Sequence, residues 1–202
     1  MERAKIILFT TLAAIGYGIV HDEVTAHLCV EYFSLAHPPL FHTDSPTALG
    51  ICWGIAATIG IGVVLGFVLA AAARSGNVPP WPTPRLMREI LALLGVMAIA
   101  ATVSGMSGYE LSRQSVIHLP ESLSEIIRPE RRDRFMAAWF AHIASYLVGL
   151  TGGAFLIFRV WRARGSPNII APVPTTGAAI IRTALLVLAA IVVIYFRFFR
   201  GH

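Results

Sequence analysis

The segment between Asp44 and Arg74 carries no charged side chain, and most of its residues are apolar. It is longer than the roughly 20 residues that an α-helix needs to cross a lipid bilayer. Charged residues make up only 13% of the whole chain, whereas a soluble domain carries about 25%. The sequence therefore predicts an all-α integral membrane protein that forms a single domain over residues 1–202.

Further apolar runs predict a helical bundle with four to five transmembrane helices. The expected spans are 4–22, 47–73, 87–109, 135–158 and 177–197. The first follows a short basic stretch, as in a signal peptide, but no cleavage site of small residues follows it, so we interpret it as a retained span. Arg182 interrupts the fifth span, so whether this span crosses the membrane is left open. Glycines four residues apart, at 50 and 54, 62 and 66, and 149 and 153, favour helix packing within the bundle over a dimer face.

Basic residues gather at those ends of the predicted spans that lie on the same side as the N-terminus. They are Arg3, Lys5, Arg74, Arg85, Arg88, Arg159, Arg162 and Arg164. The other side also holds arginines, which weaken this asymmetry but are interleaved with acidic residues: Arg113, Arg128, Arg131, Arg132 and Arg134. By the positive-inside rule the side of the N-terminus is cytoplasmic. We therefore expect a bacterial inner-membrane protein whose connections 21–46 and 109–134 face the periplasm. The net charge of +5 fits contact with lipid headgroups. No nucleic-acid-binding motif is visible, so the expected partner is the lipid bilayer and not nucleic acid.

The two expected periplasmic connections hold most of the residue types that bind metals. Nine of the eleven acidic residues lie there. Six of the seven histidines lie in or beside the same stretches: His21, His27, His37, His42, His118 and His142. Part of this clustering is ordinary topology, because the charged residues of a membrane protein collect in its connections.

The most specific pattern is the triple Glu23, His27 and Glu31. Nothing breaks a helix before His37-Pro38, so we expect the first helix to extend beyond the membrane surface for about three to four turns. Residues at i, i+4 and i+8 then share one face, with successive side chains about 40° apart. Imidazole and carboxylate groups converging in this way are suitable ligands for a transition metal.

A second set of candidate ligands lies around the second connection. Glu110, Gln114 and His118 repeat the same spacing, provided that the third helix continues past residue 109. His142 lies about two turns inside the fourth span, where an ionisable residue is a functional hypothesis by default. Ligands would then come from the first, third and fourth helices. In order of preference, the candidate metal ligands are His27, Glu31, His142, Glu23, Glu110, His118 and His21.

This mixed set of nitrogen and oxygen donors suits iron, zinc or copper better than calcium. A metal there would support redox or hydrolytic chemistry.

An alternative is a non-catalytic accessory subunit of a larger membrane complex, or a homo-oligomer, in which the polar connections are docking surfaces. Another is a b-type cytochrome, with His142 and either His21 or His27 as ligands. Haem is less favoured, because only His142 lies clearly inside a span. Cys29 and Cys52 form a disulfide, Cys29 is a soft metal ligand, or, as we favour, both are buried thiols.

The residues HDEVTA (21–26), CVEYF (29–33) and HP (37–38) follow one another in the first connection. They resemble a family of uncharacterised small bacterial multi-pass membrane proteins. The similarity continues through TDSPT (43–47) and the second span, and covers roughly residues 1–150. That family has no assigned activity, so the resemblance implies a location and a kind of organism but no mechanism.

Overall fold

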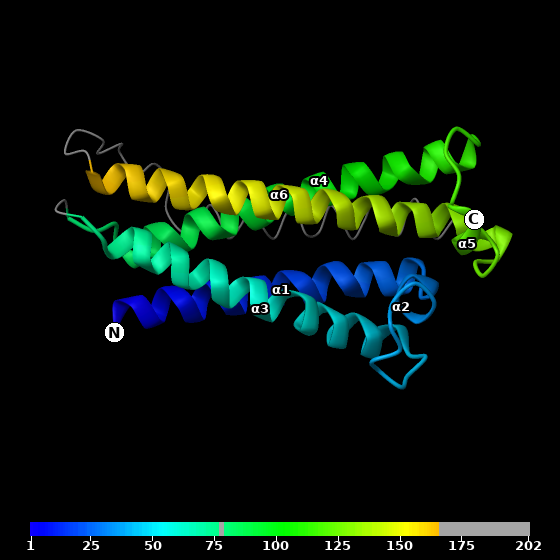
Figure 1. Cartoon of the computed structure of the whole chain (residues 1–202), viewed down its shortest axis with the longest axis horizontal. Helices are drawn as coiled ribbons and strands as arrows, with labels where there is room; N and C mark the ends of the chain where they lie inside the picture. The colour runs from blue at the N-terminus through cyan, green and yellow to red at the C-terminus, as the bar shows by residue number, and fades with distance from the viewer. Residues whose placement is uncertain (77–78, 166–202) are drawn as a thin grey trace.

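The computed structural model describes residues 1–76 and 79–165. In these ranges the chain forms four long helices: α1 (Glu2–Leu28), α3 (Pro46–Arg74), α4 (Thr83–Arg113) and α6 (Arg132–Gly165). Short helical turns lie in the connections: α2 (Glu31–Ser34), α5 (Glu121–Ser124) and η1 (Pro129–Arg131). Consecutive long helices run in opposite directions (Figure 1). The described residues contain no strand, so the predicted all-α bundle is confirmed.

Each long helix contains one of the first four predicted spans. All four are long and apolar enough to cross a membrane. Local signals set where they begin. The Ser45 hydroxyl accepts a hydrogen bond from the Ala48 backbone N–H at 3.4 Å, and Pro46 occupies the first turn of α3. The predicted fifth span, 177–197, lies outside the described residues.

The four helices form two hairpins, α1 with α3 and α4 with α6, within which the packing is most extensive. Figure 1 shows the two pairs side by side along the length of the bundle. On α3, Gly50, Gly54, Gly62 and Gly66 lie against the α1 backbone or side chains. Their predicted role in close helix packing is thereby confirmed. Gly149 and Gly153 face side chains of α4 and α3 instead, Met97 and Leu65.

The bundle has two different ends. The N-terminal end carries Met1 and the connection between α3 and α4, and the loop end carries residues 29–45 and 114–131 (Figure 1). Each end has its own apolar core. Tyr32, Phe33 and Phe135 belong to the core of the loop end, whereas Leu86 and Val160 belong to the core of the N-terminal end. A group of polar side chains lies between α1 and α6, next to the core of the loop end.

The first helix does extend past residue 22, but it ends at Leu28, and the expectation of an unbroken helix up to His37 is wrong. Cys29 adopts an extended conformation, with φ −154° and ψ 91°, before the short helix α2 begins. This break turns Tyr32 and Phe33 into the core of the loop end, where they are 7% and 3% exposed. Burying two aromatic side chains outweighs the helix propensity of a stretch that contains no proline or glycine.

Candidate functional site

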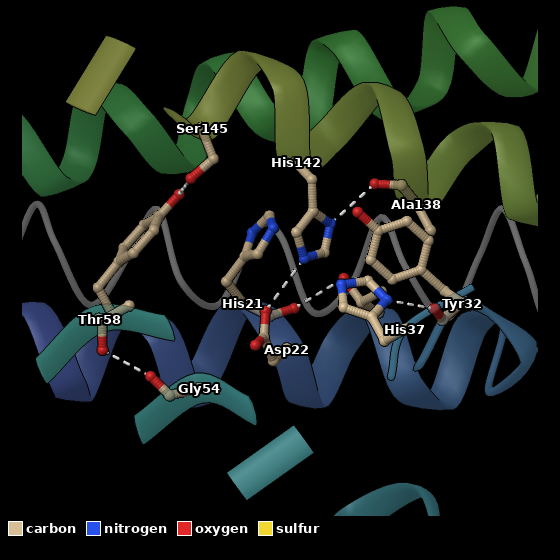
Figure 2. Close-up of polar contacts among 11 residues, drawn as sticks. His21, Asp22, Tyr32, His37, Gly54, Thr58, Ala138, His142 and Ser145 are labelled. Carbon is tan, nitrogen blue, oxygen red and sulfur yellow. Dashed lines mark hydrogen bonds and ion pairs between the residues drawn. The ribbon is translucent and has the colours of Figure 1, made fainter. Parts of the chain in front are cut away.

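His21, Asp22 and His142 meet in the interior of the bundle. Asp22 and His142 are 5% and 2% exposed, and the His142 Nε2 lies 3.2 Å from the Asp22 Oδ1. The rings of His21 and His142 are 4.4 Å apart between centroids, in an edge-to-face arrangement. One potential metal-binding atom from each of the three residues lies within 4.8 Å of the other two. Figure 2 shows the two imidazoles approaching each other from α1 and α6 above the Asp22 carboxylate.

The backbone determines how the His142 ring is oriented. Its Nδ1 lies 2.9 Å from the carbonyl oxygen of Ala138, one turn earlier in α6. A carbonyl can only accept a hydrogen bond, so Nδ1 carries a proton and donates it. The Nε2 therefore faces Asp22 and His21. The His142 Nε2 and the Asp22 carboxylate can share a single proton or bind a cation together.

His21 differs from His142 in that its Nε2 is buried and has no hydrogen-bond partner among the described residues. Its ring stacks on Tyr17 at 5.7 Å between centroids. On the other side of the site, the ring of Tyr32 lies 4.4 Å from that of His142. A buried polar atom without a partner costs about 1–3 kcal/mol. A ligand that bonded to the His21 Nε2, which lies beside a carboxylate and a second imidazole, would therefore remove this cost and stabilise the protein.

A second polar contact joins the hairpins next to the site. The Tyr17 hydroxyl and the Ser145 Oγ form a hydrogen bond of 2.7 Å, and Ser145 is 2% exposed. Like the Asp22–His142 contact, it connects α1 to α6 (Figure 2). The two contacts form a polar centre between the hairpins, in which the ring of Tyr17 lies against that of His21.

Glu31, a leading candidate ligand, lies in a different site. The helix break at Cys29 removes it from the face of Glu23 and His27, so the predicted triple does not form. The Glu31 carboxylate accepts hydrogen bonds from the Arg131 Nε at 3.0 and 3.1 Å and from the Cys29 thiol at 3.4 Å. Arg128 approaches it at 3.6 Å. A carboxylate paired in this way with permanently charged guanidinium groups is held as a structural ion pair.

These contacts change the ionisation of both groups. Burial by itself would raise the pKa of the Glu31 carboxyl, but hydrogen bonds and positive charge from Arg131 outweigh it, and the pKa lies below its ordinary value. Burial, together with the neighbouring Glu31 carboxylate, raises the pKa of the Cys29 thiol to about 12. Cys29 therefore stays protonated. Cys29 and Cys52 are both free thiols, and they form no disulfide with each other.

Glu23 and His27 do lie together, but on the side of α1 that faces α3, next to Gly50 and Thr47. The His27 Nδ1 is 2.8 Å from the Glu23 carbonyl oxygen and 3.4 Å from its carboxylate. The His27 Nε2 contacts the Thr47 hydroxyl at 3.3 Å. Both ring nitrogens thus have protein partners, and the His27 side chain is 45% exposed. The structure does not bring this pair to His142.

Glu110 and His118 are also separate from the central cluster. Helix α4 ends at Arg113, and Ser115 has a positive φ of 57°, so the expected continuation of this helix to His118 is wrong. Glu110 pairs with Arg113 at 3.1 Å near the surface, and His118 is an exposed loop residue. Of the other six candidate ligands, only His21 meets His142, whereas Glu23 and His27 contact each other away from it.

Asp22 is the residue that the sequence interpretation missed as a ligand. The spacing of residues in α1 does contain a signal for Asp22. Gly18, Asp22, Thr25 and Cys29 follow at spacings of four, three and four, and all four are buried. This spacing marks the face of α1 that turns inward. A carboxylate on that face must find a partner on another helix, because an unpaired buried charge is strongly destabilising.

Searches of protein-family models, of curated proteins and of solved structures found no match to this chain. The resemblance to a family of small bacterial membrane proteins therefore stays a prediction.

Proposed function

We propose that this membrane protein binds a transition-metal ion through His21, Asp22 and His142. The observation that carries the proposal is the buried, unpartnered Nε2 of His21 beside the Asp22–His142 pair. A cation bound there would satisfy this nitrogen and take the place of the proton that otherwise lies between the His142 Nε2 and the Asp22 carboxylate. The proposed site keeps the predicted metal chemistry and two of the seven predicted ligands, His21 and His142, and it adds Asp22 in place of the other five.

The donor set supports a transition metal. Two imidazoles and one carboxylate, with further coordination positions open, are typical of non-haem iron sites, and three protein ligands are typical of catalytic zinc. The Ala138 carbonyl acts as the outer partner that orients a metal-binding imidazole. Metal bonds of about 2.0–2.2 Å would draw the three ligand atoms somewhat closer together. When bound, such a metal supplies redox or Lewis-acid chemistry at its open positions.

The same geometry argues against the haem alternative for this pair. Two axial histidines lie on opposite faces of a macrocycle that separates their rings. The rings of His21 and His142 touch each other, with centroids 4.4 Å apart. His27, the other suggested partner, lies outside the cluster and has both nitrogens occupied.

The proposal is tested by measuring metal content after purification in a mild detergent and reconstitution with Fe²⁺, Zn²⁺ or Cu²⁺. We expect stoichiometric metal in the wild-type protein. His21→Ala should lose it, because one of three ligands is removed. This variant breaks no hydrogen bond of the His21 Nε2, which has no partner among the described residues. Asp22→Asn should also lose the metal while keeping a hydrogen-bonding group beside His142.

His27→Ala is the matched control, because it removes an imidazole from the same helix outside the cluster. Its metal content should equal that of the wild type. A wild-type protein that binds no metal under these conditions, or loss of metal in His27→Ala but not in His21→Ala, contradicts the proposal. A metal-free protein that co-purifies with a fixed partner would instead favour the accessory-subunit alternative.

A further inference from the structure

An apolar cavity of about 320 Å³ lies between the two hairpins. All four long helices line it, with side chains that include Leu65 of α3, Leu93 and Met97 of α4 and Leu156 of α6. Its volume falls at the lower end of the roughly 300–1,000 Å³ that small-molecule pockets occupy. The space is therefore suited to one slender ligand and not to a bulky one.

The cavity has one polar end, which adjoins the proposed metal ligands. Tyr17, Ser145 and Tyr146 are part of its lining. The ring of Tyr17 stacks on His21, and the ring of Tyr146 lies 5.8 Å from that of His142. Elsewhere the lining is apolar, and the hydroxyls of Thr10 and Thr58 are turned to backbone carbonyls of their own helices.

The position of the lining residues indicates how a ligand enters. Ile61 of α3 and Tyr146 and Leu150 of α6 line the cavity and are 47%, 58% and 61% exposed. Both helices are apolar enough to cross a membrane. Such partly exposed lining residues on two apolar helices favour entry from the side, between α3 and α6, at the depth of the lipid hydrocarbon.

We propose that this cavity binds a single-chain lipid taken from the bilayer. The hydrocarbon chain occupies the apolar part, and a small polar head lies at Tyr17 and Ser145, beside His21 and His142. Burial of the chain supplies the binding energy, and the two hydroxyls orient the head. Lipid binding stands on the cavity alone. A role of this lipid as the substrate of the metal centre rests, in addition, on the proposed function.

Photocrosslinking tests the proposal in the intact protein, reconstituted in phosphatidylcholine nanodiscs. The probe is a fatty acid that carries a diazirine in its chain, with and without an excess of the unlabelled acid. We expect competable labelling of cavity residues such as Met97 and Leu156, located by mass spectrometry. Gly153→Leu should place a side chain in the cavity, because Gly153 is part of the lining and a Cβ there would be in ordinary contact with the Leu65 side chain, at 3.5 Å.

Gly153→Leu should reduce competable labelling about tenfold, because the chain loses the burial of two or more methylene groups. Gly60→Leu is the control: the same substitution on an exposed part of α3, where a Cβ meets nothing within 4 Å, should leave labelling unchanged. Equal labelling in both variants, or labels only on outward-facing residues, overturns the proposal.

Metal content is measured on the same samples. A metal-free protein with labelled cavity residues would refute the metal site and retain the lipid site, whereas a metal-loaded protein without labelling would do the reverse.

Discussion

Asp22 and Glu31 are both buried carboxylates, but their partners differ in charge. Glu31 faces the guanidinium group of Arg131, which is always positively charged, so its negative charge is already compensated. Asp22 faces the imidazole of His142, which can give up a proton in exchange for a metal ion. The identity of the opposing side chain therefore separates a structural ion pair from a candidate ligand.

At the residue scale, Glu31→Gln should destabilise the protein at neutral pH by roughly 1.5–3 kcal/mol, the value typical of hydrogen bonds to a charged group. The pKa of folded Glu31 lies below its ordinary value of 4.5. Its stabilising contribution is therefore complete above that value and is lost as the pH falls through the folded pKa. Thermal unfolding in detergent, followed from pH 7 downward, should show the wild type and Glu31→Gln converging at low pH.

Glu110→Gln is the control for this titration, because Glu110 forms a more exposed pair with Arg113. Such pairs contribute about 0–1 kcal/mol, so this variant should unfold almost like the wild type at every pH. A difference between wild type and Glu31→Gln that does not shrink on acidification would contradict the assigned ion pair.

The α1–α3 hairpin depends on the absence of side chains where the helices cross. A Cβ at Gly54 would lie 2.5 Å from the backbone nitrogen of Ile19, and one at Gly18 would meet the Gly54 carbonyl oxygen. In lipid, helices associate through such close packing and not through the hydrophobic effect. The Gly18–Gly54 crossing lies just one turn from Asp22, so it also sets the position of the candidate site.

At the element scale, Gly54→Ala should destabilise the bundle by about 1–3 kcal/mol, because the two backbones must move apart. Gly60→Ala, on the same helix with open space around its Cβ, should be neutral or stabilising, since alanine favours a helix over glycine by up to about 1 kcal/mol. Unfolding of both variants in mixed detergent micelles measures the difference. Equal stability of the two would show that the crossing does not require glycine.

On the scale of the whole molecule, the two ends of the bundle differ in composition. Because the long helices alternate in direction, the basic residues of 3–5, 74–88 and 159–164 all lie at the N-terminal end (Figure 1). The positive-inside rule then places this end in the cytoplasm and the loop end in the periplasm. The orientation stays a prediction, which accessibility to a chemical label can decide.

Single cysteines in a Cys29→Ser/Cys52→Ser background provide this test. His118→Cys lies at the loop end and Ser75→Cys at the N-terminal end, and both positions are exposed. A membrane-impermeant maleimide applied to intact spheroplasts should label His118→Cys and not Ser75→Cys. After the membrane is permeabilised, both should react. The opposite pattern on intact spheroplasts would place the loop end in the cytoplasm.

Much of the architecture was predictable from local pattern. Apolar runs long enough for a bilayer crossing predicted α1, α3, α4 and α6, and the glycine spacing on α3 predicted close helix packing. The residues of the candidate site were less predictable, because the predicted ligand sets required unbroken helices. Both the Glu23–His27–Glu31 triple and the Glu110–Gln114–His118 repeat needed helices that end at Leu28 and Arg113 instead.

The sequence alone determined the class of protein, because the number, length and apolar character of membrane-spanning helices depend on neighbouring residues along the chain. It also singled out His142 as an ionisable residue inside a span. Only the tertiary structure decided which residues surround it. Asp22 and His21, its partners on α1, are separated from it by some 120 positions, and the crossing of α1 and α3, the break at Cys29 and the Tyr17–Ser145 contact together bring them into reach. Side-chain packing between helices determines such contacts, and helical periodicity within one helix does not specify them.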